Sequence, residues 1–143
     1  MRTYPPVVLG RRTMPPSLVP AHETFLSQAE RVETARRALL RCLPVGRVHR
    51  VPVSVGLDLV RDEVAGAVAE LDAWRRPEVE VVWHRVLQAC GEALQAVPEA
   101  HRVAAGTTEL EQLLGAVGEV VEPLDAWGEA ERAWLGLRIR RSS

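Results

Sequence analysis

Apolar residues recur at alternating steps of three and four between Leu57 and Val97, on both sides of Pro77. The repeating positions are Leu57, Val60, Val64, Ala67, Leu71, Trp74, Val79, Trp83, Val86, Cys90, Ala93 and Val97. This spacing predicts two amphipathic helices, each with one apolar stripe. Because Leu87 and Leu94 widen the second stripe, the pattern favours a bundle of several helices over a two-stranded coiled coil. The break at Pro77 is short, so we expect an antiparallel pair.

Prolines mark where an earlier helix should begin and end. It is predicted from Pro20 to Leu43, because proline suits a first helical turn and Pro44 follows the last residue. Its inward stripe should comprise Phe25, Ala29, Val32, Leu39 and Leu43. The segment 47–55 alternates like a strand but contains Pro52. We interpret it as an extended connection, or at most a short edge segment beside residues 7–9.

The two helices around the proline break have expected bounds of their own. The first should run over 55–74 with Ser54 as its cap, since serine is a favoured N-cap residue. The second should run over 77–97. A further turn or two is expected over 98–105, ending at Gly106.

A fourth helix is predicted from the capping-box spacing of Thr108 and Glu111. Its stripe should comprise Leu110, Leu114, Val117 and Val121. The spacing continues beyond Pro123, so we expect a kink or a close restart at this proline. The last helix should fade near Arg140.

The first nineteen residues differ in kind from the rest. They contain four prolines, which fix φ and remove backbone donors, so residues 1–19 are expected to form an extended or disordered arm. Apolar residues on this arm are candidates for contact with the bundle or with a neighbouring subunit: Tyr4, Val7, Val8 and Leu9. Residues 20–143 are expected to form a single helical domain. The predicted fold is therefore all-α, a four- to five-helix antiparallel bundle with a proline-rich extended N-terminal arm.

The composition indicates in which cellular compartment the protein is expected. No apolar run approaches the roughly 20 residues of a membrane span, and no secretory signal is recognisable. Cys42 and Cys90 lie on apolar helical faces, which predicts buried, reduced thiols and a cytoplasmic protein. The chain has no lysine and no asparagine, which indicates the codon bias of a GC-rich bacterial genome. Arginine usage is therefore not taken as evidence for phosphate binding.

Charge is distributed unevenly although the net charge is only -1. Residues 1–52 hold nine arginines against three glutamates, a balance of +6, and residues 53–143 hold nine arginines against sixteen acids, a balance of -7. Opposite charges of this kind are satisfied within one molecule, between subunits or by an external partner. Docking within one molecule is the simplest of these, and the other two stay open.

Candidate chemistry is sparse. The four histidines lack the paired Glu-x-x-His spacing of di-iron bundles, and the nearest pair, Glu80 with His84, is typical of an exposed ion pair. Neither cysteine has the open, basic surroundings of a reactive thiolate, and no glycine-rich phosphate loop occurs. We therefore assign no catalytic, cofactor or metal residue.

The tryptophans supply most of the aromatic content. Trp74 and Trp83 are expected in the core. Trp127 and Trp134 follow the break at Pro123, where an exposed apolar strip would serve as a docking surface. They join the arm residues and the arginines of the first helix, Arg36, Arg37 and Arg41, as candidate interaction residues.

These observations favour a non-catalytic interaction or adaptor protein that self-associates or docks on a protein partner. The alternative is a small nucleic-acid-associated regulator using the basic segment from Arg11 to Arg50, which the acidic remainder disfavours. A bundle enzyme with an unrecognised site is the weakest hypothesis. No membrane association and no cofactor are expected.

Overall fold

The computed structural model describes residues 12–44, 51–107 and 109–140. This part of the chain holds five α-helices: α2 (Val19–Arg41), α3 (Val53–Ala69), α4 (Glu80–Gly106), α5 (Leu110–Val121) and α6 (Ala126–Leu135). Short 3-10 turns join them: η1 (Pro16–Leu18), η2 (Leu71–Trp74), η3 (Pro77–Val79) and η4 (Glu122–Asp125). Strands β1 (Arg12–Thr13) and β2 (Ile139–Arg140) pair antiparallel. The prediction of an all-α bundle is confirmed.

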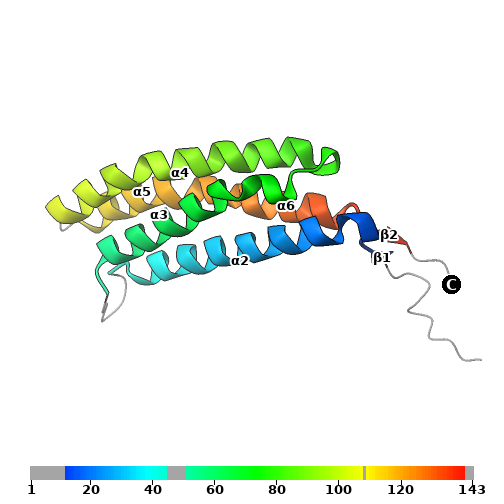
Figure 1. Ribbon diagram of the computed structural model, residues 1–143. Helices are drawn as coiled ribbons and strands as arrows, with labels where there is room; N and C mark the ends of the chain where they lie inside the picture. Colours follow the sequence, from blue (N-terminus) through cyan, green and yellow to red (C-terminus); the bar gives the residue numbers. More distant parts are fainter. Residues whose placement is uncertain (1–11, 45–50, 108, 141–143) are drawn as a thin grey trace, which may run out of the picture.

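The helices lie side by side in the order of the chain (Figure 1). α2 packs on α3, α3 on α4, and α4 packs on α5 and α6. α5, η4 and α6 follow one another along the same side of α4 (Figure 1). Together they form the fourth member of a bundle whose other members are α2, α3 and α4. None of the described helices combines the length and apolar character needed to cross a membrane.

The core is built from the predicted stripes. Val64 and Val86 are 0% exposed, and Leu71 and Val117 are 1% exposed. The stripe of α2 is also confirmed, since Phe25, Val32, Leu39 and Leu43 are buried and Ala29 is partly buried. Helical periodicity therefore identified most of the residues that leave water, which is the main driving force for folding.

Two helix bounds differ from expectation. The helix predicted over 55–74 ends at Ala69, and Leu71–Trp74 forms the separate turn η2. Conversely, α4 does not end before Pro98 but continues to Gly106. Pro98 is exposed while Val97 and Ala100 beside it are buried, so core contacts on both sides hold the helix across the missing backbone hydrogen bond.

The stripe predicted for α5 is wrong in part. Val117 and Val121 are buried as predicted, but Leu110 and Leu114 are 38% and 40% exposed, and Leu113 and Val120 are buried in their place. The buried face of α5 is rotated about the helix axis relative to the predicted stripe, because α5 packs extensively only against α4 and η4. A restart at Pro123 was expected and is confirmed by η4, which separates α5 from α6.

The predicted caps are not found. α3 begins at Val53 with Pro52 as its N-cap, so Ser54 lies inside the first turn. α5 has Glu109 as its N-cap, and the Glu109 backbone N–H donates to Thr107 Oγ1 at 3.0 Å. Thr108, the expected capping residue, lies outside the described residues.

Only part of the predicted arm is described. Residues 12–19 form β1, η1 and the first residue of α2, so the helix begins one residue before Pro20. Tyr4, Val7, Val8 and Leu9 lie outside the described residues. Of the proposed extended segment 47–55, residues 47–50 also lie outside the described residues, and residues 53–55 belong to α3 rather than to an edge strand.

The closest approach of α2 and α3 gives a first prediction. A Cβ on Gly56 would lie 2.9 Å from Leu39 Cα and 3.1 Å from Cys42 Sγ. Gly56→Ala should therefore force the two helices apart and lower the free energy of unfolding by about 1–3 kcal/mol. Gly66→Ala is the control, since nothing lies within 4 Å of its Cβ, and helix propensity should raise stability by up to about 1 kcal/mol. Equal effects in urea unfolding would contradict this prediction.

Candidate functional site

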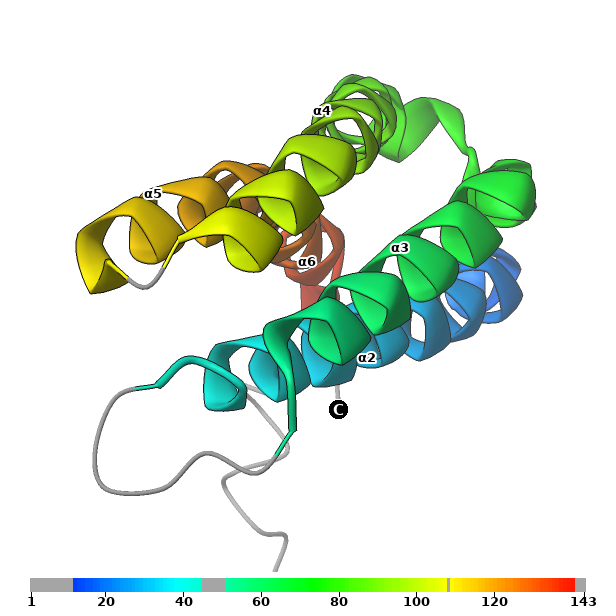
Figure 2. The same ribbon diagram turned by 90° about the vertical axis from the view of Figure 1, so that its left-hand side faces the viewer.

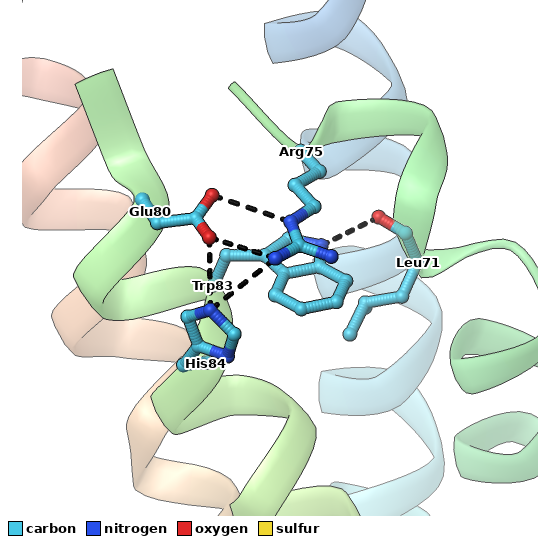
Figure 3. A network of polar contacts seen from close by, with 5 residues as sticks. All are labelled: Leu71, Arg75, Glu80, Trp83 and His84. Atoms are coloured by element: carbon cyan, nitrogen blue, oxygen red, sulfur yellow. Dashed lines mark hydrogen bonds and ion pairs between the residues drawn. The ribbon is translucent and has the colours of Figure 1, made fainter. Parts of the chain in front are cut away.

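Polar side chains gather where η2 and η3 turn the chain from α3 into α4, which we call the hairpin end (Figure 3). Arg75 donates to Glu80 through Nη2 at 2.8 Å and through Nε at 3.2 Å. His84 Nε2 lies 2.8 Å from the same carboxylate. The Arg75 guanidinium stacks 4.1 Å above the ring of Trp83, whose Nε1 donates to the Leu71 carbonyl at 2.8 Å.

This network ties the turn to α4 and is poorly suited to proton transfer. Hydrogen bonds from Arg75 and then from His84 lower the pKa of Glu80 to about 2. The carboxyl is therefore ionised near neutral pH, and it is already engaged by two partners. The exposed Glu80–His84 pair predicted from the sequence is confirmed. Among the described residues, no three His, Cys, Asp or Glu side chains are placed to hold a metal ion.

Aromatic rings fill the core of the hairpin end. Phe25, Trp74, Trp127 and Trp134 have ring centroids 4.9–6.4 Å apart. Trp127 and Trp134 are 5% and 0% exposed, so the expectation that they form an exposed strip is wrong. Their rings complete the core because α6 folds back against the start of α4.

Gln28 connects this aromatic cluster to the turn. Trp74 Nε1 donates to Gln28 Oε1 at 2.9 Å, and Gln28 Nε2 donates to the Glu70 carbonyl at 2.9 Å. Gln28 is 8% exposed. One side chain from α2 thus provides hydrogen-bond partners for a buried indole N–H and for a backbone carbonyl at the end of α3. The spacing of apolar residues along the sequence could not predict these two bonds.

His22 is a second buried polar residue at this end. Its ring centroid lies 5.2 Å from that of Trp134, and its Nε2 has no hydrogen-bond partner in the part of the chain that the structure describes. Burial lowers the pKa of His22, and the charge of Arg138 lowers it further, while Glu131 and Glu23 act in the opposite direction. The imidazole is therefore held neutral against an aromatic surface.

The opposite end of the bundle, which we call the open end, has a groove instead of a polar network. Figure 2 looks onto this end, where α2 finishes, α3 begins, and α4 gives way to α5. The groove has a volume of about 640 Å³ and is mostly apolar. Its lining comprises Cys42, Pro44, Pro52, Val53, Ser54, His101, Ala104, Ala105 and Leu113. Among the described residues, the lining contains no phenylalanine, tyrosine or tryptophan.

The polar groups at the open end are few and engaged with one another. His101 Nε2 lies 2.9 Å from Asp58 Oδ1, and Asp58 also pairs with Arg61 at 3.1 Å. Cys42 donates its thiol to the Ala38 carbonyl at 3.2 Å. The arrangement offers an apolar concave surface with a few polar groups, which is typical of a ligand- or partner-binding surface.

The two thiols are free and buried, as predicted. Burial raises the pKa of Cys90 to about 11, an effect opposed only in part by the side chain of Trp127. A thiol held protonated in this way is a poor nucleophile.

The remaining candidate interaction residues lie on α2. Arg36 pairs with Glu33 at 3.3 Å and with Asp125 of η4 at 3.7 Å. Arg37 pairs with Glu33 at 3.2 Å, and Arg41 is exposed near the end of the helix. The Arg36–Asp125 pair joins the basic early segment to the acidic later segment within one chain.

Comparison of the chain with models of protein families, with curated proteins and with solved structures finds no match. Function is therefore inferred from the chain's own geometry.

The buried imidazole predicts acid sensitivity. Because the pKa of His22 is lowered from 6.5, the unfolded chain binds a proton at pH values at which the folded chain does not. Stability should therefore fall as the pH drops from 6.5 through the folded-state pKa. His22→Phe keeps a ring against Trp134 and should reduce this loss, measured as the urea midpoint at neutral and at acidic pH. The same pH dependence in both proteins would contradict the assignment.

The bridging amide gives a separate prediction. Gln28→Met keeps the approximate size but removes both hydrogen bonds, and it should lower the free energy of unfolding by about 1–3 kcal/mol because buried groups lose their partners. Gln95→Met on the exposed face of α4 is the control, with an expected change within about 0.5 kcal/mol. A similarly small effect at Gln28 would show that water replaces the amide.

Proposed function

We propose that this chain is a non-catalytic interaction protein that self-associates or docks on a protein partner, with the open end as its docking surface. The observation that supports this most directly is the apolar groove of about 640 Å³, to which α2, α3, α4 and α5 or their flanking residues all contribute. An apolar concavity of this kind gains free energy when a partner removes it from water.

The contrast between the two ends of the bundle supports the proposal. At the hairpin end four large rings and two indole hydrogen bonds fill the core. At the open end the lining consists of small and medium side chains. Exposed apolar residues occur at both ends, Val55 and Leu110 at one and Val81 and Leu135 at the other. A cavity of about 450 Å³ beside Gln28 and Glu70 at the hairpin end has a lining that is about half polar, so the apolar character of its groove distinguishes the open end.

The polar clusters support a non-catalytic role. The carboxylates of Glu80 and Asp58 each lie against a histidine and an arginine. No serine, threonine or cysteine side chain is hydrogen-bonded to either histidine in the described residues. A nucleophile activated by an adjacent base is the usual sign of covalent catalysis.

Nucleic-acid binding is the less favoured alternative. Arg36 and Arg37 are two of the four arginines of α2. Both are paired with Glu33, and Arg36 also reaches Asp125. These acidic neighbours reduce the attraction of the arginines for phosphate groups.

A charge placed in the groove tests the proposal. Ala105 is exposed and lines the groove, so Ala105→Glu should leave the fold intact and disrupt docking. Ala65→Glu, on the exposed part of α3 outside the groove, is the control. In sedimentation velocity the wild type and the control should show species larger than one 15.8-kDa chain, and Ala105→Glu should shift toward a single chain.

Two outcomes would overturn self-association through the groove. One is a wild-type protein that stays a single chain at every concentration. The other is an Ala105→Glu variant that associates as the wild type does. Far-UV circular dichroism of each variant verifies that the helices are retained.

A further inference from the structure

The contact between α6 and α2 brings the first and last helices of the bundle together at the hairpin end. It is much less extensive than the packing of α6 on α4. Aromatic rings dominate it, since the ring centroid of Trp134 lies 5.2 Å from that of His22 and 6.1 Å from that of Phe25. The chain then continues into β2, which pairs with β1 ahead of α2 (Figure 1). We call residues 126–140, which contain α6 and β2, the closing segment.

Packing rather than hydrogen bonding holds the rings of this contact together. Trp74 and Trp83 donate their indole N–H groups to partners. The Nε1 of Trp134 and the Nε2 of His22 are buried too, but neither has a hydrogen-bond partner within the described residues. A charge placed on the His22 ring would therefore lose water without gaining a hydrogen bond at Nε2.

The charges around His22 also oppose the protonated ring. The ring is 8% exposed, and its pKa is lowered first by burial and then by the positive charge of Arg138. Glu131 of α6 and Glu23 of α2 act in the opposite direction without reversing the shift. Because Arg138 belongs to the closing segment, a proton on His22 creates repulsion between α2 and that segment.

The other two histidines of the described residues have different surroundings. His84 Nε2 lies 2.8 Å from the carboxylate of Glu80, and His101 Nε2 lies 2.9 Å from that of Asp58. A proton on either of these rings is placed beside a negative charge and disrupts no apolar contact. Mild acid is therefore expected to weaken the contact at His22 specifically.

We propose that His22 is a pH-sensitive switch: when its ring gains a proton, the closing segment separates from α2 and uncovers Trp134. Water then reaches the charged ring, so the open form binds the proton more tightly and acid favours it. Only the smaller contact of α6 has to be lost, since its packing on α4 and the Arg85–Glu129 pair do not involve His22. Acid would thus expose an aromatic surface that the bundle hides at neutral pH.

Hydrogen exchange of the full chain, followed by mass spectrometry at about pH 7.5 and about pH 5.5, tests the switch. After correction for the intrinsic exchange rates, the closing segment should lose protection at the lower pH. The loss should be at most about tenfold for each pH unit, because one proton is taken up. Residues 53–69 of α3 are the internal reference and should keep their protection. Hydroxyl-radical labelling of the Trp134 side chain should rise in parallel, while Trp83 stays protected.

Three variants assign the effect to His22. His22→Phe keeps a ring against Trp134 but cannot gain a proton, so protection of the closing segment should be the same at both pH values. Arg138→Gln changes an exposed side chain, removes the nearby positive charge and should reduce the pH response. His84→Gln, on the exposed face of α4, is the control and should respond as the wild type does.

Three results would overturn the inference: a closing segment equally protected at both pH values, a loss of protection that is equal in all helices, or a wild-type response in His22→Phe. The second result would mean that the whole bundle unfolds. None of these measurements involves the groove at the open end, so the switch and the proposed docking surface are tested separately.

Discussion

The fold depends on hydrogen-bonding two indole groups at the hairpin end. Trp74 and Trp83 are buried rings whose N–H groups would each cost free energy if they lost water without a new partner. Gln28 of α2 accepts from Trp74, and the Leu71 carbonyl accepts from Trp83. Because both bonds involve η2, this turn is fixed against α2 on one side and α4 on the other. These contacts fix the end of α3, while its apolar stripe packs along the rest of the helix against α2 and α4.

Because of this arrangement, the two ends of the bundle differ in how densely their side chains are packed. Four aromatic rings gather around the hairpin end, and aromatic side chains bury more area than any others. The far end is left with valine, leucine, alanine and proline, which fill the space between four helices less completely, and a groove remains. The groove proposed as a docking surface at the open end thus results from the absence there of the large rings that fill the hairpin end.

Charge has a smaller role in the fold than its uneven distribution along the chain suggests. Half of the ion pairs among the described residues join neighbouring turns of one helix, and exposed pairs of this kind are worth about 0–1 kcal/mol. Arg36 with Asp125 and Arg85 with Glu129 are pairs that join separate elements. The separation of basic and acidic segments therefore contributes little to stability, and its larger effect would be on the choice and orientation of a partner.

Periodicity alone determined the class of fold, the number of helices and most of the core, because residues that share a helical face must leave water together. It did not determine what each face meets. Two residues of the α5 stripe were misplaced because α5 packs extensively only on α4 and η4. Trp127 and Trp134 were expected outside because the helix that carries them, α6, follows a proline break. The end of α3 at Ala69, the bridge through Gln28 and the groove arise between residues distant in sequence. Such contacts have no period along the chain, so only the tertiary structure decided them.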